Sequence, residues 1–136
     1  MAHAIVQQTL VDGHKLTIVK YTIKGDGASV DLNQELLFDA STFLTASLHN
    51  KIMEIDYCLN GFSATLYWDA ASPLQALSLA ESYPHHMDYW DVGGLVNNGG
   101  TGQTGDIKIS TSGLSASTKD GFILFYLMER KVPISN

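Results

Sequence analysis

Apolar residues along this chain recur mostly at every second position, in short runs separated by turn residues. This alternation is the period of a strand with one buried face, whereas a helix repeats its apolar residues every three to four positions. In residues 15–24 we expect one face to point into the core, and that face carries Thr17, Val19, Tyr21 and Ile23. The pattern therefore predicts an all-β protein.

Two turn sequences predict β-hairpins. Asp12 and Gly13 separate residues 3–11 from residues 15–24, and Asn60 and Gly61 separate residues 51–59 from residues 62–70. Asp-Gly and Asn-Gly favour two-residue hairpin turns because both of their residues tolerate positive φ. We expect the two runs of each pair to be neighbouring strands of one sheet.

Three later runs, residues 74–80, 106–113 and 121–132, also have strand composition. The last run is apolar on both faces, which predicts a central strand covered from both sides. Residues 31–50 predict a loop with one helical turn at most, capped by Asp39. Seven or eight short strands predict an antiparallel sandwich of two sheets, jelly-roll-like, in one domain over residues 1–136; a closed barrel is the alternative.

Length and charge narrow the classes of partner. A chain of 136 residues can bury a core of its own without disulfides, and we expect the one cysteine, Cys58, to be a buried packing thiol. The formal charge is -6 and the eight Lys and Arg residues are scattered singly, which predicts no nucleic-acid partner. The N-terminus lacks the pattern of an export signal, and no apolar run is long enough for a membrane span. We expect a soluble protein without its own signal peptide.

The segment GTGQTG, residues 100–105, fits the G-x-G-x-x-G pattern of dinucleotide-binding loops. That pattern binds phosphate only where a helix follows, because the helix N-terminus supplies the amides. A strand pattern follows here, so we predict no nucleotide cofactor. Ordering a loop as long as residues 91–105 costs about 15 to 30 kcal/mol of backbone entropy. The loop is therefore either mobile or held by contacts from outside itself, such as a neighbouring subunit.

Residues 82–91 gather the side chains with the most reactive chemistry: His85, His86, Asp88, Tyr89, Trp90 and Asp91. Neighbouring residues of an extended chain point to opposite faces, so we predict no metal site, although His85 with Asp88 in a turn remains open. The spacing of Asp69, Asp88 and Asp91 requires no acid–base pair, and no Gly-x-Ser-x-Gly elbow occurs. We predict a protein that is not an enzyme and carries no cofactor.

Two alternatives stay open for the same residues. Trp68, Tyr89 or Trp90 could stack on sugars, which would make the chain a glycan-binding module for host attachment. The aromatic residues could equally anchor a protein interface, where Trp and Tyr are enriched. A third hypothesis, a small hydrolase, would use Asp88 or Asp91 with His85 or His86.

An ordered set of motifs between Ile52 and Arg130 resembles small virion structural proteins of tailed bacteriophages, particularly those of aquatic phages. The set comprises a strand closing on Trp-Asp-Ala, a Gly-Gly-Leu-x-Asn-Asn step, a Gly-rich stretch reaching Thr-Gly-Asp-Ile, and a Ser-Thr pair after the next strand. This chain departs from the family pattern at two places. Residues 81–86 form a longer segment than the pattern has, and Leu114 stands where a tryptophan is expected.

The resemblance implies a β-sandwich capsid decoration (cement) protein that binds the major capsid protein on the outside of the virion, often as a homotrimer, and reinforces the shell. A head-completion or tail role stays open. The matched positions are implied to lie at the interface, and we expect Tyr89 and Trp90 to join them: Trp68, Asp69, Gly93, Gly94, Leu95, Asn97 and Asn98.

Overall fold

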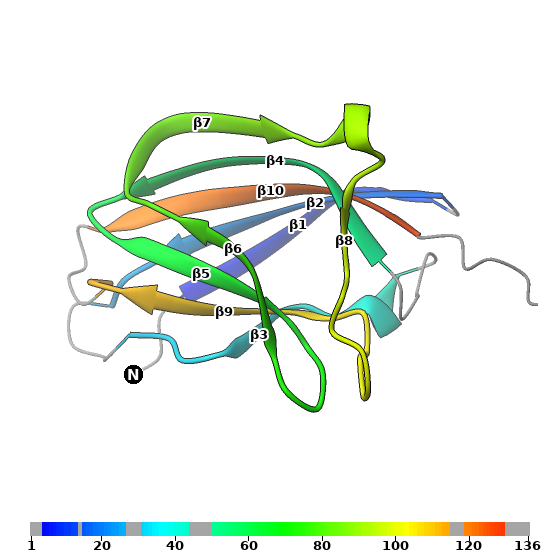
Figure 1. Ribbon diagram of the computed structural model, residues 1–136. Helices are drawn as coiled ribbons and strands as arrows, with labels where there is room; N and C mark the ends of the chain where they lie inside the picture. Colours follow the sequence, from blue (N-terminus) through cyan, green and yellow to red (C-terminus); the bar gives the residue numbers. More distant parts are fainter. Residues whose placement is uncertain (1–3, 14, 27–30, 44–49, 115–118, 130–136) are drawn as a thin grey trace, which may run out of the picture.

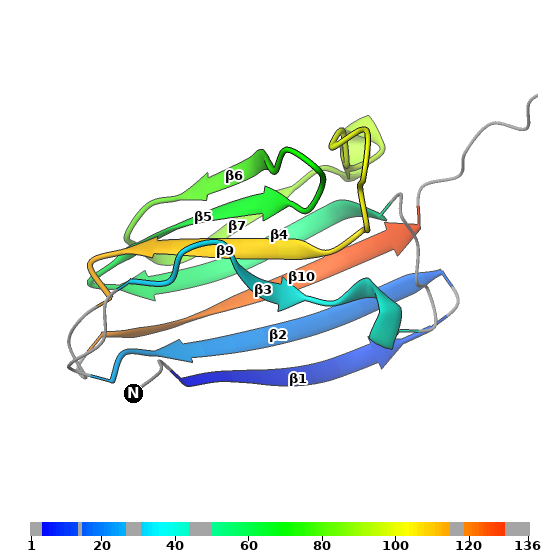
Figure 2. The same ribbon diagram turned by 90° about the horizontal axis from the view of Figure 1, so that it is seen from below.

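Two antiparallel sheets packed face to face make up the part of the chain that the computed structural model describes, residues 4–13, 15–26, 31–43, 50–114 and 119–129. The sandwich seen in Figures 1 and 2 confirms the predicted jelly-roll-like, all-β fold. Figure 2 shows the smaller sheet in front of the larger one. Neither of the short helical turns in these residues could cross a membrane.

The larger sheet, sheet A, has the strand order β1-β2-β10-β4-β7, and β8 also pairs with β4. The smaller sheet, sheet B, has the order β3-β9-β5-β6. Sheet A consists of β1 (Ala4–Asp12), β2 (Leu16–Lys24), β10 (Asp120–Glu129), β4 (Asn50–Asn60), β7 (Ser82–Asp88) and β8 (Leu95–Val96). Sheet B consists of β3 (Glu35–Phe38), β9 (Ile107–Ser112), β5 (Ser63–Trp68) and β6 (Leu74–Leu79). Two 3-10 turns, η1 (Ala40–Thr42) and η2 (Trp90–Val92), complete the fold.

The core lies between the inner faces of the two sheets. As predicted, Thr17, Val19, Tyr21 and Ile23 of β2 are buried. Burial of apolar surface on this scale is the main force that holds the sheets together. The largest side chains that are almost fully buried come from both sheets: Trp68, Tyr21, Phe38, Phe125, Ile23, Ile52, Ile55, Leu59, Leu66, Leu79, Ile107 and Ile109.

One predicted hairpin is confirmed and the other is wrong. β1 pairs with β2 on either side of the Asp12-Gly13 turn. The runs on either side of Asn60-Gly61 do not pair, because β4 belongs to sheet A and β5 to sheet B. Each of these strands already has two neighbours in its own sheet, and each buries its inner face against the other sheet. Gly61, with a φ of 86°, lets the chain turn from one sheet to the other, and the buried Phe62 fills the corner.

Three strands were not expected from the sequence: β3, β7 and β8. β7 covers residues around Pro84 to which the sequence analysis assigned no strand. It lies at the edge of sheet A, where a proline costs no ladder hydrogen bond on the free side. In residues 31–43, the predicted helical turn is present as η1, and the Asp39 carboxylate accepts a hydrogen bond from the Ser41 amide at its start. Residues 44–49 lie outside the described residues.

The outer face of sheet A differs from expectation at two strands. Cys58 is partly exposed there rather than buried, because the core-facing positions beside it are Tyr57 and Leu59. β10 is central, as predicted, with β2 on one side and β4 on the other. Its inner face is buried, whereas the residues of its outer face keep part of their surface open within the described chain: Phe122, Leu124, Tyr126 and Met128.

Candidate functional site

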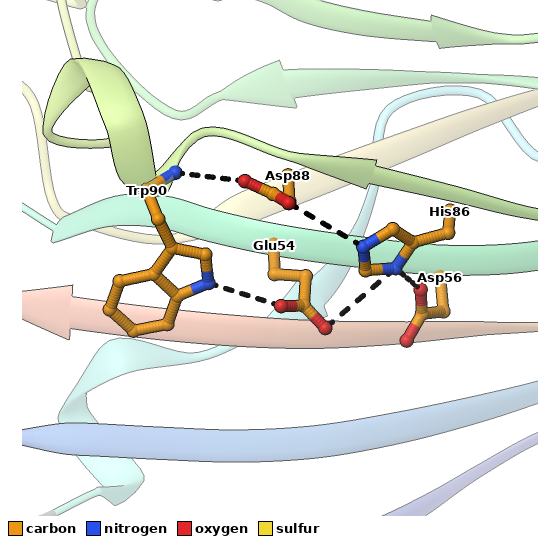
Figure 3. A network of polar contacts seen from close by, with 5 residues as sticks. All are labelled: Glu54, Asp56, His86, Asp88 and Trp90. Carbon is orange, nitrogen blue, oxygen red and sulfur yellow. Dashed lines mark hydrogen bonds and ion pairs between the residues drawn. The ribbon is translucent and has the colours of Figure 1, made fainter.

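A cluster of polar side chains lies on the outer face of sheet A, where β4 pairs with β7. Strand register places Asp56 opposite His86 and Glu54 opposite Asp88. The His86 Nδ1 atom makes a short hydrogen bond with the Asp56 carboxylate and lies 3.8 Å from Glu54. The Trp90 indole N–H donates to Glu54 at 3.0 Å and closes one end of the cluster, as Figure 3 shows. We call these five residues the His86 cluster.

The carboxylates around His86 favour the protonated form of its ring. The hydrogen bond to Asp56 raises the pKa of His86, and the nearby charges of Glu54 and Asp88 act in the same direction. A histidine whose pKa is raised by folding adds stability fully below its unfolded pKa of about 6.5. That contribution is lost as the pH rises through the raised pKa. Below the raised pKa, the protonated His86 ring of β7 makes ionic contacts with Glu54 and Asp56 of β4. Deprotonation of the ring removes its charge and with it these ionic contacts.

Three members of the cluster could supply metal ligands. One ligand atom each of Glu54, Asp56 and His86 lies within 4.8 Å of the others. Asp88 lies 3.8 Å from Nε2, which points away from the Nδ1 atom that faces Asp56 and Glu54. It therefore cannot complete the same coordination sphere without moving. Each ring nitrogen of His86 faces a carboxylate, Nδ1 that of Asp56 and Nε2 that of Asp88. A doubly protonated ring therefore offers one N–H to each carboxylate without a metal ion.

The hydrolase hypothesis can be compared with these contacts. The Asp56 carboxylate and the His86 ring are hydrogen-bonded like the carboxylate and the base of a catalytic triad, which are two of its three members. Cys58 lies on the same face, two residues along β4, but no hydrogen bond joins it to His86 in the described structure. The arrangement open from sequence, His85 with Asp88, is replaced by His86 with Asp88. His85 faces the other side of β7, with its ring 5.5 Å from that of Tyr57.

A second feature is the end of the sandwich where the glycine loop meets the turn after β5; we call it the glycine-loop end (residues 69–73 and 97–106). Thr104 donates a hydrogen bond of 2.8 Å to the Asp69 carboxylate, and Lys108 pairs with the same carboxylate at 3.1 Å. Burial opposes ionisation of Asp69, but these hydrogen bonds and the Lys108 charge outweigh it and lower the pKa of Asp69. The ionised carboxylate therefore ties the loop to β5 and β9.

The backbone adds further ties between the same two segments. The Ala71 amide donates to the Thr101 carbonyl at 3.1 Å, and the Thr104 amide donates to the Asp69 carbonyl at 3.3 Å. Asn50 of β4 donates to the Gly105 carbonyl at 2.9 Å, and Asn97 is buried. Of the two states that the sequence left open, the described structure has the loop held by contacts from outside it, and these come from the same chain. Figures 1 and 2 both show the turn after β5 beside the loop before β9.

The sequence-predicted interface residues fall into two environments. Trp68 and Asn97 are both buried, at 1% exposure. Trp68 lies in the core between the sheets, and the Asn97 side chain accepts a hydrogen bond from the Gly99 amide within the glycine loop. The other positions keep part of their surface exposed: Asp69, Tyr89, Trp90, Gly93, Gly94, Leu95 and Asn98. Asp69 and Asn98 belong to the glycine-loop end, whereas Trp90 belongs to the His86 cluster on sheet A. Trp90 is the most open aromatic residue of this set, at 45% exposure.

The sequence did not single out Glu54 or Asp56. Both stand at alternate, outward positions of a strand, which is the usual place for a solvated carboxylate. Their link to His86 depends on the pairing of β4 with β7, and β7 was not expected to be a strand. The alternation of Glu54, Asp56 and Cys58 on one face was the signal that the sequence held.

The outer face of sheet A also has a hollow of about 800 Å³. It lies beside Phe122 and is lined by charged and polar side chains from four segments: Lys20, Thr22, Asn60, Glu81 and Asp120. The Lys20 ammonium lies over the Phe122 ring, 5.1 Å from its centre.

Comparison with known proteins identifies no family. No protein-family model matches the chain, and no curated protein matches it. Among solved structures, an RmlC-like cupin family protein with a double-stranded β-helix fold from Methanocaldococcus jannaschii is similar at a TM-score of 0.34 and 8% identity. The similarity covers 94% of this chain and 82% of that one. At this score the likeness carries no argument about function.

Replacing Asp69 by alanine is expected to loosen the glycine-loop end. The loss of two polar contacts should lower the free energy of unfolding at neutral pH by about 1 to 2 kcal/mol, and should speed hydrogen exchange at the Ala71 and Thr104 amides. Because folding lowers the pKa of Asp69, its contribution is present above the unfolded pKa and disappears as the pH falls through the folded pKa. The difference from the wild type should therefore shrink in acid. Asp91→Ala, which removes an exposed carboxylate, is the control and should change neither measurement.

Proposed function

We propose that this chain is a structural docking protein of a virion, a capsid decoration protein that attaches to the outside of the shell through its glycine-loop end. The proposal rests on the ordered resemblance to small phage virion proteins. One structural observation supports it: motifs that are far apart in the sequence, Trp-Asp-Ala at residues 68–70 and the glycine loop before Asp106, meet at one end of the sandwich.

The glycine-loop end is suited to docking for a physical reason. Its backbone is tied down at Asp69 and Ala71 before any partner binds, so little ordering entropy is lost on association. Thr101, Gly102 and Ser72 are exposed at its tip and carry no charge, so desolvation there costs little. On a capsid, many such weak contacts act together and gain strength from their number.

Sedimentation with capsids of the virus whose genome encodes this chain tests the proposal. Wild-type protein should sediment with expanded shells at a fixed ratio to the major capsid protein. Thr101→Arg should weaken this binding about tenfold or more without a change in melting temperature, because it places a bulky charge at the docking tip. Gln75→Arg, the same kind of change on exposed β6, should bind like the wild type. Absence of wild-type binding to expanded and unexpanded shells would refute decoration, and unimpaired binding by Thr101→Arg would refute the assigned surface.

Glycan binding is the second candidate, and exposure of Trp90 is the observation that favours it. The Glu54 carboxylate holds the indole at its N–H, so the ring is oriented while 45% of the residue stays open. Trp68 offers no such platform because it is buried. A glycan array should then show a binder whose signal disappears in Trp90→Ala; an array without binders, or one indifferent to this substitution, removes the candidate.

A further inference from the structure

The outer face of sheet A has an apolar stripe with no described element against it. β10 contributes Phe122, Leu124, Tyr126 and Met128, and β2 contributes Ile18 directly beside Tyr126. We call these five residues the β10 stripe. Exposed Val11 of β1 lies next to Ile18 and widens the stripe toward the sheet edge. Strands with apolar residues on both faces are usually buried on both faces. The described chain buries only the inner face of β10.

Charges of opposite sign flank the β10 stripe. On the β2 side lie Lys20 and Lys24, and Lys24 is at the level of Asp120 of β10. On the β4 and β7 side lie the carboxylates of the His86 cluster, and Lys51 follows at the level of Met128. Strand register places Lys20, Leu124 and Asp56 side by side on neighbouring strands, at one level of the sheet. At the level of Leu124 the face is therefore positive on the β2 side and negative on the β4 side.

This charge pattern is complementary to itself under one rotation. If a second copy is turned by half a turn about an axis parallel to β10, the β2 of each copy lies over the β4 of the other. Leu124 then meets Leu124 of the other copy at the centre, and Lys20 of each copy lies over Asp56 of the other. An axis perpendicular to the strands would instead bring Lys20 onto Lys20 and Asp56 onto Asp56. Like charges at such contacts are destabilising, so the charges favour the parallel axis.

We infer that a second copy of this chain covers the outer face of sheet A, forming a two-fold dimer in which the β10 stripes pack together and Lys20 pairs with Asp56 across the interface. Sheets packed face to face in this way are aligned, as in other β-sandwich contacts. Asp56 hydrogen-bonds His86 within its own chain, and Lys20 of the other copy would be a second cationic partner of the same carboxylate. Glu54 lies at the level of Ile18, where Trp90 and His86 of its own chain contact it. The pairing does not depend on the proposed capsid binding, which uses the glycine-loop end.

Light scattering of the full-length protein across a concentration series tests the inference. The molar mass should rise to twice 14.8 kDa. Lys20→Glu should raise the dissociation constant about tenfold or more, because two acidic groups then face each other at two places in each dimer. The double variant Lys20→Glu with Asp56→Lys should restore dimers, since each new glutamate faces a new lysine. The perpendicular axis predicts no such rescue, because like charges would still meet.

A second measurement keeps the inference testable if the charge variants fold poorly. In a Cys58→Ser background, Leu124→Cys should be cross-linked to dimers by a short bismaleimide, because the two copies of residue 124 meet at the axis. Leu74→Cys, an exposed leucine position on sheet B, is the matched control and should remain monomeric under the same treatment. A monomer or a trimer at every concentration, an unaltered dimer in Lys20→Glu, or equal cross-linking at both positions would overturn the inference.

Discussion

Trp68→Ala should lower the free energy of unfolding by about 3 to 5 kcal/mol, the range for removing a fully buried aromatic side chain. Trp68 is 1% exposed and packs in the core that both sheets share. Truncation removes its transfer free energy and leaves a cavity that the flanking strands β6 and β9 cannot close without breaking their register with β5. The loss is a large share of the about 5 to 15 kcal/mol that stabilises an ordinary domain.

Urea unfolding, followed by far-ultraviolet circular dichroism, measures this effect without relying on tryptophan fluorescence. Trp90→Ala is the matched control, because this second tryptophan is 45% exposed and its indole N–H hydrogen-bonds Glu54 on the outer face of sheet A. It should cost about 1 kcal/mol or less, the usual range for a surface hydrogen bond. Equal losses in the two variants would mean that Trp68 does not pack in the core as described.

Gly121→Ala should cost about 2 to 3 kcal/mol, as overpacking of a tightly packed site typically does. A Cβ atom at Gly121 would overlap the Cys58 carbonyl oxygen and lie 3.1 Å from the Leu59 Cα atom, both on β4. These are backbone atoms, so the overlap can be relieved only by moving β10 away from β4. The two strands pair at ten positions in the centre of sheet A, and their separation would disturb the whole sheet.

The same urea assay applies to Gly121→Ala, with Gly93→Ala as its control. Gly93 has a φ of 81°, and no heavy atom lies within 4 Å of the place that a Cβ atom would take, so its substitution strains the backbone without overlap. That strain costs about 1 to 2 kcal/mol. A smaller loss at Gly121 than at Gly93 would show that β10 and β4 are less closely paired than the structure describes.

Several features could be predicted from local pattern. Alternation assigned the core face of β2, because a strand with one wet side must place its apolar residues at every second position. The strand after GTGQTG could be predicted in the same way, and with it the absence of the helix that phosphate binding requires. The Asp12-Gly13 hairpin followed from turn chemistry, and β1 and β2 pair on either side of that turn.

Pairing between distant strands could not be predicted. Asn60-Gly61 has the preferred hairpin sequence, yet the strands on either side enter different sheets, because the neighbours available to each strand outweigh the turn preference. The His86 cluster depends on the register of β4 with β7, which two strands can adopt in several ways of equal local merit. The contacts that hold the glycine loop also come from residues about thirty positions earlier in the chain, Asp69 and Ala71.

The sequence by itself determined the all-β class, the inward face of the clearest strands and the central place of the last strand, because each depends on the period of neighbouring residues. Only the tertiary structure decided which strands share a sheet, which carboxylates surround His86, and that the outer face of β10 is left uncovered by the described chain. Those features arise from contacts between residues far apart in the chain, whose free energy depends on the whole set of pairings rather than on any one segment.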